Sequence, residues 1–165
     1  MTGRASRDKG VLEAGRIFAI DPGTTHSGLV IMVDGRVTSS GVLANREMLD
    51  EIAIHDGTPM ACEMIASYGM AVGKEVFETC VWIGRFIERR QNPDDVRLIY
   101  RKDVKLHLCG SPRAKDANIR QALIDRWGGK AEAVGTIKKP GPLYGVKSHA
   151  WAALAVAVTA LETKP

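Results

Sequence analysis

Two acidic residues in apolar surroundings are the first candidates for chemistry in this chain. Asp21 directly follows the apolar run from Ile17 to Ile20, and a Pro-Gly pair then turns the chain sharply. Glu63 is the one charged residue in an apolar segment that runs from 59 to 65. A buried carboxylate is costly unless it is paired, protonated or bound to a cation. If the two segments are neighbouring strands, about 4.8 Å apart, Asp21 and Glu63 could hold one divalent cation between them.

Each of the two acids also has a simpler interpretation. Asp, Pro and Gly all favour turns, so Asp21 could serve the turn alone. Glu63 could face solvent on an edge strand. A right-handed crossover through the helix expected between the two strands makes the second strand a parallel neighbour of the first, which favours the metal interpretation.

The elements that must position these acids follow from the spacing of apolar residues. Strands are predicted over 17–20, 27–33 and 37–43, with Asp34-Gly35 as a hairpin turn that makes this part antiparallel. Further strands over 59–65 and 96–100 are expected to add to the sheet in parallel. The pattern therefore predicts an α/β fold with a mixed five-stranded sheet, three strands antiparallel and then two parallel, flanked by helices.

Four helices are predicted around this sheet, and the third of them follows the basic segment and contains Ile119, Ala122, Leu123 and Trp127. Asn45 is expected to cap the first, and an amphipathic helix over 72–90 is expected to pack Phe77, Val81 and Gly84 toward the sheet. The last helix spans 148–163, with Ser148 as its N-cap. That start places His149 in the first turn, where its side chain could point back at the strand ends.

A basic segment lies between the fifth strand and the next helix. It runs from 101 to 120, is broken by Gly110 and Pro112, and contains four candidate phosphate contacts: Lys105, Arg113, Lys115 and Arg120. The alternative is a solvated helix face that binds nothing. A second basic stretch, 128–147, has the Gly and Pro content of a loop.

The composition is that of an ordinary globular domain. The chain has 165 residues, 45% of them hydrophobic, and its net charge of +4 suits a polyanionic partner without requiring one. Its three cysteines are widely spaced, so neither a disulfide framework nor a zinc site is indicated, and an intracellular, cytoplasmic location is expected. No apolar run is long enough for a membrane span. We expect a flexible leader over 1–15 and one domain over 16–165.

Taken together, four stretches resemble the RuvC family of Holliday junction resolvases, within the ribonuclease H-like superfamily. They are Ile20-Asp-Pro-Gly-Thr-Thr-His-Ser-Gly28, Ala61-Cys-Glu63, the segment from Val104 to Lys115, and His149-Ala-Trp-Ala-Ala-Leu-Ala-Val156. The resemblance runs from about Arg16 to Leu161, and a phage-type member is among the alternatives. It implies a ribonuclease H-like fold and a bacterial or phage-infected cell.

The resemblance also implies a site. Asp21 and Glu63 match two metal-binding acids of the family, and His149 falls where the family has Asp or His, so all three are implied ligands of Mg²⁺ or Mn²⁺. Lys105 and Lys115 match two family lysines, which places Lys115 at the catalytic site. The chain departs from the pattern at Ala152, where a further Asp is usual. Either a reduced ligand set suffices, with water or Asp116 completing it, or the site is impaired.

The implied activity is metal-dependent cleavage of four-way (Holliday) or other branched DNA junctions, with two metal ions assisting phosphodiester hydrolysis. A two-fold homodimer would present paired sites to the paired strands of a junction. Tyr68, in the loop after Glu63, could stack on an exposed base or pack on the protein itself.

Other classes remain open at this point. The turn after Asp21 also resembles the first phosphate loop of actin-like ATPases, although those proteins need two such domains. Another ribonuclease H-like nuclease, acting on RNA–DNA hybrids or ribosomal RNA precursors, is an alternative enzyme. A branched-DNA binding module that has lost cleavage is the alternative suggested by Ala152.

Overall fold

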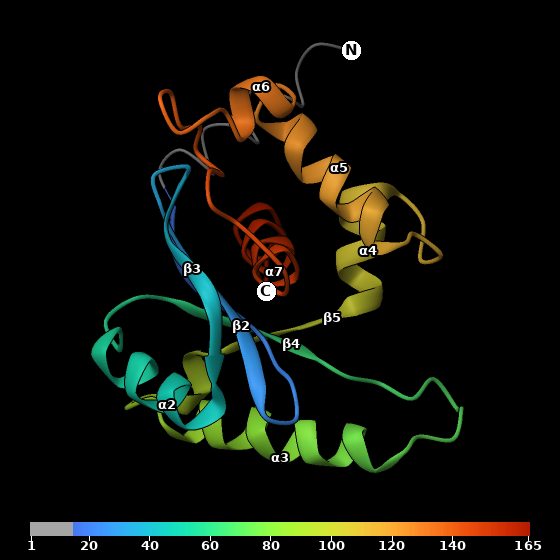
Figure 1. Ribbon diagram of the computed structural model, residues 1–165. Coiled ribbons are helices and arrows are strands. Elements are labelled where there is room, and N and C mark those ends of the chain that lie inside the picture. Colours follow the sequence, from blue (N-terminus) through green and yellow to red (C-terminus); the bar gives the residue numbers. More distant parts are fainter. Residues whose placement is uncertain (1–14) are drawn as a thin grey trace.

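A mixed five-stranded sheet forms the centre of the computed structural model, which describes residues 15–165 (Figure 1). The sheet has the order β3-β2-β1-β4-β5, with β1 antiparallel to β2, β2 antiparallel to β3, and the pairs β1–β4 and β4–β5 parallel. The predicted fold class is confirmed. The strands are β1 Arg16–Asp21, β2 His26–Val33, β3 Arg36–Ala44, β4 Met60–Met64 and β5 Arg97–Tyr100.

The boundary between a leader and a single domain is not tested by the structure. The predicted leader lies outside the described residues except for Gly15, so this division stays a prediction.

Helices cover both faces of the sheet. Figure 1 shows α2 (Asn45–Ile54) and α3 (Lys74–Glu88) on one side, and α4 (Arg101–Cys109), α5 (Asp116–Arg126) and α7 (Ala150–Glu162) on the other. Two short elements complete the described part, η1 (Pro93–Asp95) and α6 (Lys130–Ala133). No helix among residues 15–165 is both long and apolar enough to cross a membrane.

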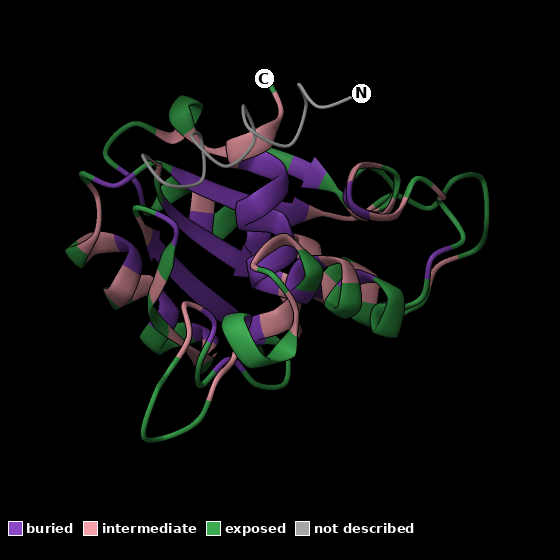
Figure 2. Cartoon of the chain, turned by 90° about the horizontal axis from the view of Figure 1, so that it is seen from above, coloured by how far each residue is buried: buried purple, intermediate pink, exposed green. Residues whose placement is uncertain are grey.

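Alternation along β1 divides the apolar side chains between two cores. Ile17 and Ala19 join the core beneath α7, whereas Phe18 and Ile20 join the core beneath α2 and α3. α7 is rich in alanine and buried along most of its length, which lets it lie directly on the sheet (Figure 2). Because side chains alternate along a strand, Asp21 continues the α7 face.

The prediction that Phe77, Val81 and Gly84 of α3 pack toward the sheet was wrong. Phe77 and Val81 are each 63% exposed, and a Cβ added to Gly84 would meet open space rather than the sheet. Thr79 and Phe86 face the core instead. A buried Thr is tolerated here because its hydroxyl donates to the Glu75 carbonyl oxygen at 2.8 Å.

The basic segment and the long loop are more regular than predicted. Residues 101–109 form α4, which follows β5 directly and ends at Gly110 in the left-handed conformation, with φ of 71°. Within 128–147, α6 and a bridge between Gly135 and Pro140 order the chain, and the Val37 N–H donates to the Pro142 carbonyl oxygen at 3.0 Å. This segment is therefore fastened to the edge strand β3.

Candidate functional site

The two acids lie side by side at the C-terminal ends of β1 and β4. Ile20 pairs with Cys62 in the parallel register, so the next residues, Asp21 and Glu63, are neighbours across the two strands. Glu63 lies on the α7 face, like Asp21, and is 8% exposed. The prediction that the two strands are parallel neighbours is confirmed, and Glu63 is not on an edge strand.

A buried polar network fixes the turn that follows Asp21. The Gly23 N–H donates to Ser27 Oγ at 3.1 Å, and the Asn45 side-chain amide donates to the Gly23 carbonyl oxygen at 2.9 Å. Ser27 Oγ in turn donates to Asn45 Oδ1 at 2.6 Å. Asn45 therefore stabilises the turn through its side chain. The prediction that it caps α2 was wrong, because Ala44 occupies the capping position and Asn45 is the first residue of the helix.

His149 meets Asp21 at the start of α7. Its Nδ1 lies 3.4 Å from Asp21 Oδ2, and its side chain is 71% exposed. The predicted cap at Ser148 is wrong: His149 occupies the capping position, and Ser148 has a φ of 52°. Gly28 on β2 makes the approach possible, since a Cβ there would lie 2.4 Å from the His149 carbonyl oxygen.

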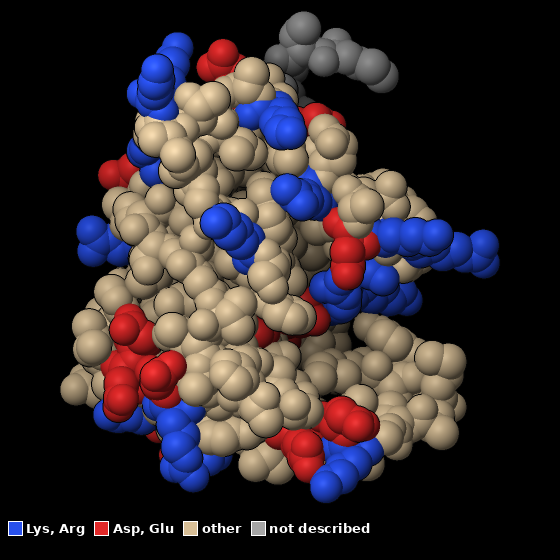
Figure 3. Space-filling view, viewed as in Figure 1, with Lys and Arg blue, Asp and Glu red and all other residues tan. Residues whose placement is uncertain are grey.

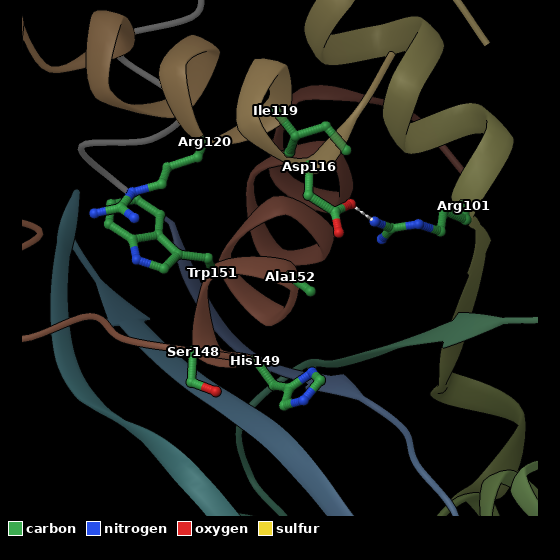
Figure 4. A pocket seen from close by; sticks show the side chains of 8 residues that line it. All are labelled: Arg101, Asp116, Ile119, Arg120, Ser148, His149, Trp151 and Ala152. Carbon is green, nitrogen blue, oxygen red and sulfur yellow. Dashed lines mark hydrogen bonds and ion pairs between the residues drawn. The ribbon is translucent and has the colours of Figure 1, made fainter. Parts of the chain in front are cut away.

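Arg101 is the site residue that sequence reasoning missed. Glu63 pairs with Ile99 in the β4–β5 register, and Arg101 comes two residues later on the same face. Its Nη1 lies 3.4 Å from Glu63 Oε2, and its Nη2 pairs with Asp116 Oδ1 (Figure 4). The available signal was its position directly after a predicted parallel strand, which places it at the edge where Asp21 and Glu63 lie.

Burial disfavours the charged forms of both acids. Burial is the main cause that raises the pKa of Glu63 to about 7, the Asp21 charge adds to the rise, and Arg101 opposes it. Burial likewise raises the pKa of Asp21, against the opposing effects of His149 and Arg101. A further positive charge in this place would therefore stabilise the ionised forms.

An open cavity of about 520 Å³ connects these groups. Asp21, Glu63, Arg101, Asp116, His149 and Ala152 all line it, together with the turn from Pro22 to His26. Carboxylate oxygens are ligands of both Mg²⁺ and Mn²⁺, and one imidazole nitrogen suits Mn²⁺ better than Mg²⁺. As the side chains stand, however, no group of three His, Cys, Asp or Glu among residues 15–165 could hold an ion. The contacts of Asp21 with His149 and of Glu63 with Arg101 occupy the carboxylates instead.

The four basic residues predicted to contact phosphate lie at different places around this cavity. Lys105 lines a neighbouring cavity of about 570 Å³ together with Glu63 and Tyr68, and Arg120 lines one of about 240 Å³ together with His149. The Arg120 guanidinium stacks on Trp151, with its Cζ 4.8 Å from the ring centroid. Lys115 directly precedes Asp116 and is exposed, as is Arg113 in the turn before it. Figure 3 shows Lys and Arg side chains gathered beside a hollow on this face.

Tyr68 projects from the loop between β4 and α3. It is 59% exposed, which leaves part of its ring open to solvent. Lys102 Nζ lies 5.6 Å from its ring centroid, which places an aromatic face and a cation together beside Glu63.

The mixed five-stranded sheet flanked by helices is a ribonuclease H-like fold. Two solved structures share this fold. One is Thermus thermophilus RuvC, with a TM-score of 0.62 and 18% identity, and the match covers 87% of this chain and 92% of that chain. The other is T. thermophilus RuvC in complex with a Holliday junction substrate, with a TM-score of 0.62 and 20% identity, and the match covers 88% of this chain and 92% of that chain. The resemblance to RuvC is thus confirmed for the fold. No family model and no curated protein matches the chain.

Proposed function

We propose that this protein is a metal-dependent endonuclease that cuts four-way or other branched DNA junctions. The observation that carries the proposal is the pair Asp21 and Glu63, buried side by side at the ends of adjacent parallel strands with His149 at 3.4 Å from Asp21. The likeness in fold to a RuvC solved with a Holliday junction supports the choice of substrate. A DNA substrate would require a location inside a cell, and the likeness in fold to T. thermophilus RuvC supports a bacterial or phage-infected cell.

The chain's own residues divide the chemistry between them. Asp21, Glu63 and His149 would hold Mg²⁺ or Mn²⁺, which when bound would supply the positive charge needed for in-line displacement at phosphorus. The exposed ammonium of Lys115, next to Asp116 at the cavity rim, would bind the phosphate that is cut. Lys105 and Arg120, in the two neighbouring cavities, would hold the backbone on either side, and Arg113 would extend this contact.

Tyr68 would act on the bases rather than on the backbone. Its exposed ring beside Lys102 offers a stacking surface next to the cavity that contains Glu63. Base stacking on an aromatic side chain contributes about 1–3 kcal/mol per base. Tyr68→Ala is therefore expected to weaken binding to a junction more than binding to linear duplex.

A homodimer would form through the exposed side of α3. Phe77 and Val81 lie on this side, and an antiparallel pairing of two copies centred on Val81 places Lys74 of one copy opposite Glu88 of the other. Val81→Lys would put two like charges at the centre of that contact. Sedimentation of the variant as a monomer, where the unmodified protein sediments as a dimer, would support this interface.

One specific observation favours a second candidate function. Ala152 lines the acid cavity without a donor, as expected of a branched-DNA binding module with impaired cleavage. In that case the protein would bind four-way junctions without cutting them in either metal.

Nicking of a synthetic four-way junction in Mg²⁺ or Mn²⁺ tests the proposal. Linear duplex and an RNA–DNA hybrid serve as competing substrates, and the hybrid also tests the alternative of another ribonuclease H-like nuclease. Asp21→Asn and Glu63→Gln should abolish nicking, whereas Asp50→Asn and Glu132→Gln, exposed acids on α2 and α6, should not. Junction binding without metal-dependent nicking would favour the binding module instead.

A further inference from the structure

The acid cavity has a gap on its α7 side. Ala152 lies one helical turn after His149 and lines the cavity with Asp21 and Glu63, but its methyl group offers no donor. The resemblance to RuvC puts an acid at this position, and the chain has none between Ala133 and Leu161. A metal ion between Asp21 and Glu63 would therefore lack one ligand from α7.

Asp116 faces the same space from the opposite wall. It is the first residue of α5, and it lines both the 520 Å³ cavity and the 240 Å³ cavity together with His149 and Ala152. Figure 4 shows its carboxylate extending from α5 toward Arg101, beside Ala152. Its side chain is 85% exposed, which leaves it free to turn into the cavity.

Arg101 couples Asp116 to the strand-end acids. Its guanidinium lies between the two carboxylates, at 3.4 Å from Glu63 Oε2 and paired with Asp116 Oδ1. The negative charge of Asp116 is among the causes that raise the pKa of both Asp21 and Glu63, so all three acids share one electrostatic environment. The guanidinium thus occupies the place of a cation among them.

We propose that Asp116 supplies from α5 the acidic metal ligand that position 152 does not supply from α7, and that Arg101 holds Asp116 beside Glu63 until the ion enters. The inference rests on the proposed function, because that function requires the metal. Arg101 also lines all three cavities, so its side chain has open space to turn into when a divalent ion replaces its charge. Its guanidinium would then face the phosphate backbone.

Titration of the metal-free, full-length protein with Mn²⁺, followed by the electron paramagnetic resonance signal of free Mn²⁺, tests this assignment without DNA. Asp116→Asn should weaken Mn²⁺ binding on the order of tenfold or more. Asp125→Asn is the matched control, because Asp125 lies on the same helix, is exposed and pairs only with Gln121 among the side-chain contacts of the described residues. It should leave Mn²⁺ binding unchanged.

The double variant Asp116→Asn with Ala152→Asp decides between a ligand and a mere partner of Arg101. If Asp116 replaces the missing acid, Asp at position 152 should restore Mn²⁺ binding to nearly the wild-type affinity. Equal Mn²⁺ affinities for Asp116→Asn and Asp125→Asn would overturn the proposal, as would a double variant no better than Asp116→Asn. Wild-type protein that binds no Mn²⁺ at millimolar concentration would overturn it as well.

These results are separable from the test of the proposed function. If the variants bind Mn²⁺ as expected but the unmodified protein never nicks a junction, the proposed nuclease function is refuted and the assignment of Asp116 as a metal ligand stands. Metal-dependent nicking with unchanged Mn²⁺ binding in Asp116→Asn would do the opposite. Circular dichroism melting of each variant confirms that it is folded, which is expected because Asp116 is exposed.

Discussion

The two halves of the acid cavity are built in different ways. Asp21 and Glu63 lie on adjacent parallel strands, where backbone hydrogen bonds fix their separation. His149, Ala152 and Asp116 lie at the starts of two helices, whose positions depend on side-chain packing. We call Asp21 and Glu63 the strand half of the cavity, and His149, Ala152 and Asp116 its helix half. Both acids expected in the strand half are present, whereas the acid expected at position 152 of the helix half is absent. Sheet register fixes the position of a strand side chain such as Asp21, whereas the starts of two different helices reach the same cavity.

The largest expected effect is a difference in nicking rate between a variant of the strand half and a variant of the helix half. Asp21→Asn should lower the rate of junction nicking by about 10³-fold or more, because it removes a charge held in a fixed, buried position. His149→Ala should lower it by about 10–100-fold, because His149 is exposed and neighbouring groups can compensate. Single-turnover nicking in Mn²⁺ measures both rates. Equal losses would show that the two halves contribute alike.

The next effect concerns the pH dependence of stability in the strand half. Burial raises the pKa of Glu63 to about 7 from 4.5, so between these values the folded protein holds a proton that the unfolded chain has lost. Stability of the metal-free protein should therefore fall as pH rises through this window, by up to about 3 kcal/mol. Urea unfolding in EDTA from pH 4.5 to 8 measures the fall.

Glu63→Gln is the control for this dependence, since an amide does not titrate. Its stability should change less across the window than that of the unmodified protein. Mg²⁺ should also stabilise the unmodified protein more than Glu63→Gln above pH 7, where the carboxylate is charged. Parallel curves for the two proteins would mean that Glu63 does not carry the shift.

A third effect concerns how closely the helix half approaches the sheet. Gly28→Ala would place a Cβ 2.4 Å from the His149 carbonyl oxygen, so the start of α7 would have to move. We expect a loss of about 1–3 kcal/mol in the free energy of unfolding, measured in urea. Gly41→Ala on β3 is the matched control, because a Cβ there meets nothing within 4 Å. Equal stability of the two variants would argue against this close contact.

The sequence predicted the strand half well because its signals are local. An apolar run that ends in Asp21 and a lone acid in a second run locate two strand ends, and Asp34-Gly35 indicates the hairpin between β2 and β3. The structure bears out this turn, with φ of 50° at Asp34 and 78° at Gly35. The parallel pairing of β1 and β4 then follows from the handedness of crossovers.

Contacts made by the helices elsewhere in the molecule were predicted less well, because they depend on tertiary packing. Arg101 reaches Glu63 because β5 lies beside β4, and the predicted parallel strand gives its place at this edge but not its contact with Glu63. Asn45 was assigned to a cap, since its bonds to Gly23 and Ser27 span 22 and 18 residues. On α3, alternative apolar stripes compete, and the one that contains Phe77 proved to be the exposed one.

The smallest expected effect tests whether His149 acts as a ligand. An imidazole favours Mn²⁺ over Mg²⁺ relative to an all-oxygen set, so His149→Asp should lower the ratio of nicking rates in Mn²⁺ and Mg²⁺ by a few-fold. His26→Asp is the matched control: His26 lines the same cavity, but its Nδ1 lies 3.1 Å from Thr25 Oγ1 rather than beside Asp21. Its nicking rates can fall through added negative charge, but their ratio should stay unchanged. If both variants shift the ratio equally, the metal preference comes from the charge of the cavity and not from a bond to His149.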